Sequence, residues 1–238
     1  MPDDEKPLGG GWVTAGVVRV GETVRRPLGP SAPFVHALLA HLEEVGFDGS
    51  PRLLGIDEQD REVLTYLDGD VPSDCRDMVW DDRQVAAAGG LLRRFHDATV
   101  GTELAGTNEV VCHNDFGPWN LVWREGVPVA IIDFDAAAPG QRIDDLGYAI
   151  WKHLNLGLID LAPAEQGRRI RVLISAYGAA PATDVLPAVV RAEERMQRKL
   201  EAGPANNSRA AALAQLHGER RWLEAHLEEL GQEFHGAG

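Results

Sequence analysis

The stretch NLVWREGVPVAIIDF, residues 120–134, restricts the fold of this chain more than any other part of the sequence. Two β-prone runs flank Glu125-Gly126, which is a turn signal, so the stretch predicts a β-hairpin. A hairpin returns its two ends to one place. Those ends carry Asn120 and Asp133, thirteen residues apart. The sequence therefore predicts that an amide and a carboxylate meet beside this hairpin.

The segment HNDFGPWN, residues 113–120, adds a second carboxylate from Asp115. Gly117-Pro118 continues neither a helix nor a central strand, so the segment is predicted to be a loop. Carboxylate and amide oxygens that converge at a strand end suit Mg²⁺, which completes its shell with water and phosphate oxygens. A carboxylate that is not bound to the metal can accept a proton from an attacking hydroxyl. This combination is typical of phosphoryl transfer.

Each of these residues also has a structural interpretation. Asp115 and Asn120 could stabilise a turn, because Asx side chains bend loops. Asp133 could cap the end of a strand. The joint spacing, with His113 before the loop and IDFD after it, favours functional roles for all of them. Asp135 is expected beside the metal ligands, where it supports them.

The pattern of elements predicts two lobes in an α+β chain. The N-lobe, residues 1–68, should hold a loose tail over 1–8, a glycine-rich loop, two hairpins and one helix. The C-lobe, residues 69–238, should be larger and mainly helical. The expected strands are 17–20 and 23–26, with two more around a polar turn at 57–61; the expected helices lie near 31–46, 81–99, 144–156, 163–178, 184–202 and 208–231.

The residues His113-x-Asp115-x-x-x-x-Asn120, followed by Ile132-Asp133-Phe134-Asp135, resemble the signature of aminoglycoside phosphotransferase-like kinases. RIDDLGYAIW, residues 142–151, is also similar to that family. The resemblance implies a bilobal protein-kinase-like fold. It also implies an ATP-dependent small-molecule kinase, which moves the γ-phosphate of ATP to a hydroxyl of a small molecule.

The resemblance implies a role for each residue of the motif. Asp115 would be the catalytic base, or would orient the substrate hydroxyl, and His113 would brace the loop. Asn120 and Asp133 would hold Mg²⁺ on the nucleotide phosphates. Asp145 would anchor the loop by hydrogen bonds.

The nucleotide would be held in the N-lobe. By the same resemblance, Gly10, Gly11 and Thr14 would belong to the loop that covers the phosphates. Tyr66 and Leu67 would form the hinge whose backbone meets the base. A short glycine run alone could equally be part of a flexible tail.

One departure from the family concerns the cation on the strand after the glycine loop. Such kinases carry a Lys there, paired with a Glu on the next helix, but this strand reads TVRR. Strand alternation places Val24 and Arg26 on one face, so Arg26 is the candidate phosphate ligand. The expected position of the partner Glu falls near His36. Glu43 and Glu44 lie in the last turns of the helix, where a solvated face is expected.

Composition limits the partners and the compartment. The net charge of −14 disfavours nucleic acid and anionic membrane surfaces. It is compatible with a cationic small-molecule substrate, although solubility alone also explains it. Asp144 and the acidic residues of 193–201 are expected on solvated helix faces, with the lining of an aminocyclitol pocket as the alternative. Two cysteines far apart, no signal peptide in MPDDEKPLGG and no long apolar run favour a cytoplasmic location. His36 and His41 are five residues apart, a poor spacing for a helical metal site.

Two other hypotheses remain beside the kinase. The absent Lys and the unclear Glu suggest a nucleotide-binding kinase-like module with weak or no catalysis. A third possibility is transfer of the nucleotidyl group. For the kinase itself, the family resemblance leaves aminoglycoside-like molecules, amino-alcohols and sugars open as acceptors, because one fold serves many substrates.

Overall fold

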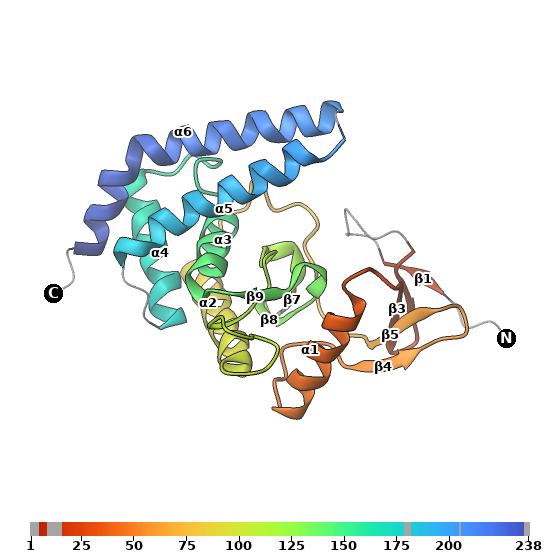
Figure 1. Cartoon of the computed structure of the whole chain (residues 1–238). Helices are drawn as coiled ribbons and strands as arrows, with labels where there is room; N and C mark the ends of the chain where they lie inside the picture. Colours follow the sequence, from red (N-terminus) through yellow and green to blue (C-terminus); the bar gives the residue numbers. More distant parts are fainter. Residues whose placement is uncertain (1–4, 9–15, 179–181, 205, 236–238) are drawn as a thin grey trace.

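The computed structural model describes residues 5–8, 16–178, 182–204 and 206–235, and shows a small sheet joined to a larger helical region (Figure 1). The prediction of an α+β chain with a β-rich N-lobe and a mainly helical C-lobe is confirmed. The elements of the N-lobe are β1 (Lys6–Pro7), β2 (Val18–Val20), β3 (Thr23–Pro27), α1 (Ala32–Glu44), β4 (Leu53–Ile56) and β5 (Arg61–Thr65).

These five strands form one antiparallel sheet in the order β1-β2-β3-β5-β4. β2 and β3 make the predicted hairpin, with Gly21 at a φ of 59° in the turn, where a side chain would be strained. β3 pairs with β5 in a register that sets Arg26 opposite Glu62. Because directly opposed residues share one face of a sheet, this register brings the two side chains together.

The expectation of a loose tail over residues 1–8 is wrong in one part. Lys6 pairs with Arg19 and Pro7 with Val18, so β1 adds an edge strand to the sheet. Both residues of β1 are exposed. A two-residue strand without a buried side chain has no alternating pattern, and only its backbone pairing reveals it.

The chain enters the helical region through Asp70, whose backbone exchanges two hydrogen bonds with Trp123, at 2.9 and 2.8 Å. The elements beyond it are α2 (Asp82–Thr99), β6 (Val110–Cys112), η1 (Pro118–Asn120), β7 (Leu121–Arg124), β8 (Val127–Ile131), η2 (Phe134–Ala136), β9 (Ala138–Gly140), α3 (Arg142–Leu154), α4 (Pro163–Tyr177), α5 (Ala182–Ala202) and α6 (Asn207–His235). The helices lie where their periodicity predicts them.

α2 begins at a capping box. Asp81 accepts a hydrogen bond from the Gln84 backbone at 2.8 Å, and the Gln84 side chain accepts one from the Asp81 backbone at 2.7 Å. The apolar face of the helix, with Leu92 and Phe95 fully buried, packs into the core. α2 contacts both β8 and α4, so it connects the hairpin to the other helices of the C-lobe.

The hairpin predicted from residues 120–134 is present as β7 and β8 (Figure 1). Arg124 pairs with Val127, and Glu125 and Gly126 form the turn with φ values of 50° and 76°. A second short ladder joins β6 to β9, and the sequence analysis did not predict β9. The two ladders hold both ends of the segment between β6 and β7.

The remaining helices form the far part of the C-lobe, where α5 and α6 lie side by side away from the sheet (Figure 1). α3 is the central helix of this part, because it packs against α5, α2 and α4. Its residues Leu146, Ile150 and Leu154 are fully buried. In the described parts of the chain, no helix has both the length and the apolar character that a bilayer span requires.

Candidate active site

The loop after β6 brings Asp115 and Asn120 into direct contact. The Asn120 side-chain nitrogen donates to the Asp115 carboxylate at 2.9 Å and to its backbone oxygen at 3.0 Å. The other carboxylate oxygen of Asp115 accepts a hydrogen bond from the Tyr148 hydroxyl on α3. Burial raises the pKa of Tyr148 most, and the charge of the Asp115 carboxylate raises it further. The hydroxyl of Tyr148 therefore stays protonated and acts as a donor.

The hairpin returns Asp133 to the same place at the level of the backbone. Ile132 donates its N–H to the Asn120 carbonyl at 2.9 Å, directly after the Leu121–Ile131 pair. Asp133 then takes a left-handed conformation, with φ 60° and ψ 66°, and turns the chain out of the strand. Aspartate tolerates this region better than most residues with a side chain. Its carboxylate is therefore displayed at the end of β8 and is partly exposed.

Arg26 reaches this carboxylate from the N-lobe. Its Nη1 donates to Asp133 at 3.2 Å, its Nη2 to Asp135, and its Nε to Glu62. Burial alone would lower the pKa of Arg26, but the hydrogen bonds and charges of Glu62 and Asp135 raise it above its ordinary value. The guanidinium is thus a permanent charge that links the two lobes at the predicted site.

The sequence analysis missed Glu62 as a partner of Arg26. The Glu62 side chain is 2% exposed, and its second oxygen lies 2.7 Å from Nε2 of His36 on α1. Glu43 and Glu44 are exposed, as expected. The available signal was an acidic residue at an inward position of a strand, which becomes informative only once the pairing of β3 with β5 is known.

A buried network holds the loop from behind. Asp145 accepts hydrogen bonds from the backbone of His113 at 2.7 Å, from the backbone of Asn114 at 2.9 Å and from the His96 ring at 3.1 Å. Burial alone would raise the pKa of Asp145, but the hydrogen bond and charge of His96 hold it below its ordinary value. Together with Cys112, the side chains of His96 and Asp145 form a group of residue types that can bind a metal ion. Because both Asp145 oxygens already accept hydrogen bonds, we interpret the group as a brace.

His113 lies inside this brace, fully buried. Its Nε2 is 3.1 Å from the carbonyl oxygen of Ile132, and its ring makes edge contacts with Phe116 and Phe134. His113 therefore ties the loop to the end of β8, next to Asp133. This contact fixes the spacing between the two motifs.

The structure describes only some of the residues that are predicted to bind the nucleotide. Gly10, Gly11 and Thr14 lie outside the described residues. Tyr66 follows β5, and its backbone N–H donates to Glu22 at 2.9 Å, while Arg19 stacks over its ring. The N–H of Tyr66 is therefore already engaged within the sheet.

A group of charged residues on α3, α5 and α6 forms a second feature, and its member Lys152, which the sequence analysis did not single out, lies close enough to Asp115 for their charges to interact. Burial lowers the pKa of Lys152 to about 8, while the charges of Glu219 and Asp115 oppose that effect. Burial raises the pKa of Glu193 to about 7, although Arg220 lies 3.3 Å from it. The expectation that the acidic residues of 193–201 are solvated is wrong for Glu193, because α6 covers this side of α5.

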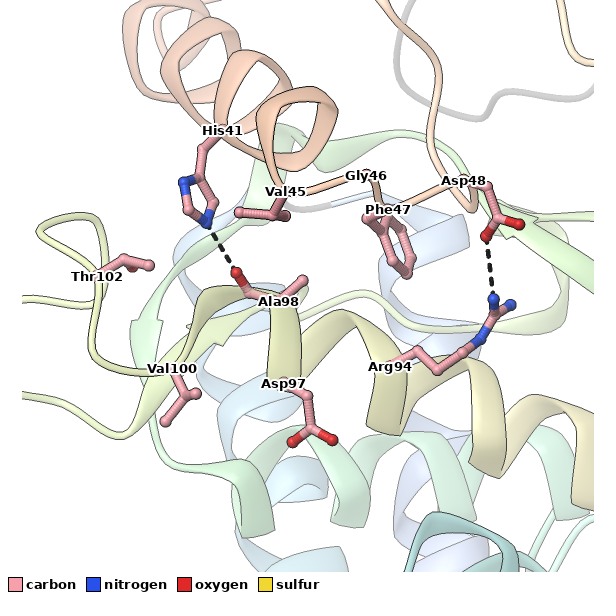
Figure 2. Close-up of a pocket in the computed structure, with 10 residues that line it drawn as sticks. All are labelled: His41, Val45, Gly46, Phe47, Asp48, Arg94, Asp97, Ala98, Val100 and Thr102. Atoms are coloured by element: carbon pink, nitrogen blue, oxygen red, sulfur yellow. Dashed lines mark hydrogen bonds and ion pairs between the residues drawn. The ribbon is translucent and has the colours of Figure 1, made fainter.

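A pocket of about 570 Å³ lies elsewhere, between the ends of α1 and α2 (Figure 2). Across the pocket, the His41 ring forms a hydrogen bond of 2.7 Å with the Ala98 carbonyl, and Arg94 forms an ion pair of 3.0 Å with Asp48. None of the site residues predicted from the sequence lines this pocket. The residues with predicted chemical roles lie instead around Arg26, Asp115 and Asp133.

Comparison with known protein sequences identifies a matching family and a relative. A family model described as the phosphotransferase enzyme family matches residues 102–183, which include the loop and the hairpin. The trifolitoxin immunity protein of Rhizobium leguminosarum bv. trifolii is 34% identical over 203 residues, which cover 75% of this chain and 75% of that protein.

Solved structures share the fold at low identity. An ethanolamine kinase of Plasmodium vivax superposes with a TM-score of 0.63 at 11% identity, over 85% of this chain and 77% of that chain. A spectinomycin phosphotransferase, solved in complex with ADP and spectinomycin, gives a TM-score of 0.55 at 11% identity, over 90% and 87% of the two chains. The predicted kinase-like fold is confirmed.

Proposed function

This chain belongs to the phosphotransferase enzyme family, and from that premise we propose that it transfers the γ-phosphate of ATP to a hydroxyl of a small molecule. The observation that carries the proposal is the meeting of Asp115 and Asn120 beside the hairpin end that displays Asp133 to Arg26. Two carboxylates, one amide and one guanidinium provide what phosphoryl transfer needs, namely positioning and charge stabilisation. The division at residue 68 into two lobes is part of this proposal.

The residues around Asp133 fit a magnesium ion. The Asn120 amide directs its nitrogen to Asp115, and within the described residues its oxygen accepts no hydrogen bond. That oxygen and the Asp133 carboxylate form an oxygen-only set, which Mg²⁺ prefers when phosphates complete its shell. We assign Asn120 and Asp133 as its ligands, with Asp135 beside them. Bound there, the ion would neutralise charge that develops on the phosphates.

Asp115 is assigned as the base or orienting carboxylate. The hydroxyl oxygen of the acceptor attacks the γ-phosphorus, the bond to the bridging oxygen of the leaving diphosphate breaks, and the hydroxyl proton passes to Asp115. The hydrogen bonds from Asn120 and Tyr148 hold the carboxylate in one orientation. His113 and Asp145 keep its loop in place through the contacts described above.

Arg26 is assigned to the nucleotide phosphates. Its side chain faces Asp133, where the metal and the phosphates would meet. A guanidinium binds phosphate oxygens as a two-pronged donor, so it can replace the usual ammonium. Gly10, Gly11, Thr14, Tyr66 and Leu67 remain our prediction for the rest of the nucleotide site.

A second candidate function follows from the 34% identity with a toxin immunity protein. In this alternative the chain protects by binding a toxin or a nucleotide, with weak or no phosphoryl transfer. The two candidates differ in one measurable property, because only the kinase consumes ATP in proportion to acceptor.

A coupled assay of ADP release tests the proposal. The acceptors to screen are hydroxylated amines, amino-alcohols, aminoglycosides and sugars, with Asp115→Ala as the matched control. We expect acceptor-dependent ADP release that the variant lacks, with one phosphate added to the product by mass spectrometry. Calorimetry that detects Mg²⁺ and ATP binding without any turnover would favour the binding module, and the appearance of a nucleotidyl adduct would contradict phosphoryl transfer.

A further inference from the structure

The cation of the nucleotide site has an unusual partner. In protein kinases the strand Lys pairs with a Glu on the next helix. In this chain α1 carries His36 near that position, and the two glutamates of the helix, Glu43 and Glu44, are exposed. The carboxylate that contacts Arg26 comes instead from β5, through Glu62.

The sheet places this carboxylate with little freedom. Arg26 and Glu62 are directly opposed in the ladder between β3 and β5, so their backbones fix the distance between the side chains. The Glu62 side chain is 2% exposed. One oxygen accepts from Arg26 Nε and the other lies 2.7 Å from the His36 ring, so both oxygens are engaged.

The contact also sets the direction of the guanidinium. With Nε occupied by Glu62, the terminal nitrogens Nη1 and Nη2 face Asp133 and Asp135 on the C-lobe. The two terminal nitrogens of Arg26 are thereby directed at Asp133, an assigned metal ligand, and at Asp135 beside it. A buried ion pair is weak evidence for stability, because desolvation offsets much of its attraction. Orientation is the effect that this geometry explains best.

We propose that Glu62, held by His36, is the positioning residue that orients Arg26 toward the nucleotide phosphates, in place of a helix glutamate. This inference rests on the proposed function, because it assumes that Arg26 binds phosphate. Glu62 acts through Arg26 and touches neither substrate nor metal. Removing it should therefore weaken nucleotide binding only while Arg26 is present.

A double-mutant cycle on nucleotide affinity tests this coupling. The probe is ATP with Mg²⁺, titrated into the full chain by calorimetry. We expect Glu62→Gln and Arg26→Gln each to weaken binding by about tenfold or more, and the double variant to bind no more weakly than Arg26→Gln alone. Glu62→Asp, which keeps the charge, should recover part of the loss.

Asp57→Asn is the matched control. Asp57 pairs with Arg61 at 2.9 Å and lies 3.6 Å from Arg25, the neighbour of Arg26 on the opposite face of β3. This variant removes a strand-linked ion pair from the same sheet and should leave nucleotide affinity unchanged. Thermal melts of all variants verify that they are folded, and the charge-keeping Glu62→Asp covers the case in which Glu62→Gln unfolds.

The possible outcomes separate the two proposals. Failure of the wild-type chain to bind ATP with Mg²⁺ would overturn the proposed function, and this inference with it. Normal binding by a folded Glu62→Gln variant would overturn the inference alone. Losses that add in the double variant would also overturn it, since Glu62 would then act independently of Arg26.

Discussion

At the scale of single residues, Asp115 is the group on which the chemistry should depend most. Its carboxylate oxygens receive hydrogen bonds from Asn120 and Tyr148, which lie on different elements. We expect Asp115→Ala to lower kcat by about 10²-fold to 10⁴-fold, the usual contribution of a positioned base. Nucleotide affinity should stay within about twofold, because the carboxylate is assigned to the acceptor hydroxyl. Steady-state kinetics and calorimetry measure the two quantities, and turnover near that of the wild type would contradict the assignment.

His153 provides a prediction about stability and pH. It is 1% exposed, and burial lowers the pKa of its ring to about 4 from 6.5. Between these values the unfolded chain binds more protons than the folded one, so stability falls as the pH falls from 6.5 toward 4. The expected loss of unfolding free energy from this residue is about 3 kcal/mol.

Urea titrations across that range measure this loss. His153→Leu removes the titrating group, and its unfolding free energy should change less with pH than that of the wild type. An equally steep decline in the variant would assign the acid sensitivity to other groups. The carboxylates held at low pKa, including Asp145, should contribute only at lower pH.

At the scale of elements, the packing of α3 against α5 depends on a glycine. A Cβ at Gly147 would lie 2.5 Å from the Ala188 backbone carbon and 2.6 Å from its oxygen. The two helices therefore approach too closely for a side chain. We expect Gly147→Ala to lower the free energy of unfolding by about 1–3 kcal/mol, the usual cost of overpacking. Chemical denaturation measures the change.

Gly218→Ala on α6 is the matched control for this prediction. Nothing lies within 4 Å of a Cβ at Gly218, so alanine should raise stability by up to about 1 kcal/mol through helix propensity alone. The two glycine replacements should thus have opposite signs. A stabilising Gly147→Ala would show that α3 and α5 can separate without loss.

At the scale of the whole molecule, charges from both lobes meet at one place. Arg26 from the sheet contacts Asp133 and Asp135 beyond the hairpin, and Ile131 donates to the Gly49 carbonyl at 2.8 Å. A nucleotide with Mg²⁺ at this place would contact both lobes. Binding there should stabilise the fold as one unit, because a ligand of the folded state alone shifts the unfolding equilibrium.

Thermal melts with ATP and Mg²⁺ test this expectation. At a concentration of 100 times Kd the stabilisation is about 2.7 kcal/mol. For a chain of this size that corresponds to a rise in Tm of roughly 5–10 °C. A chelator, or the variant Asp133→Asn, should remove most of the rise. An equal rise without Mg²⁺ would contradict the assignment of Asp133 as a metal ligand.

Much of the architecture follows from the sequence alone, because its causes are local. The turn at Glu125-Gly126, the cap at Asp81 and the apolar faces of the helices depend on neighbours within a few residues. The hairpin between Asn120 and Asp133 is of the same kind. That hairpin is the most informative part of the candidate site, whereas the fold class followed from the order of elements along the chain and from the family resemblance.

The tertiary structure decided which side chains far apart in sequence are partners. Glu62 meets Arg26 because β3 pairs with β5, and His36 joins them because α1 packs nearby. The contact of Tyr148 with Asp115 depends on the position of α3 relative to the loop after β6. No periodicity encodes such contacts, since their free energy arises only when separate elements share one buried environment. The physical division is between short-range backbone preference, which a sequence displays, and long-range charge pairing, which only the folded chain creates.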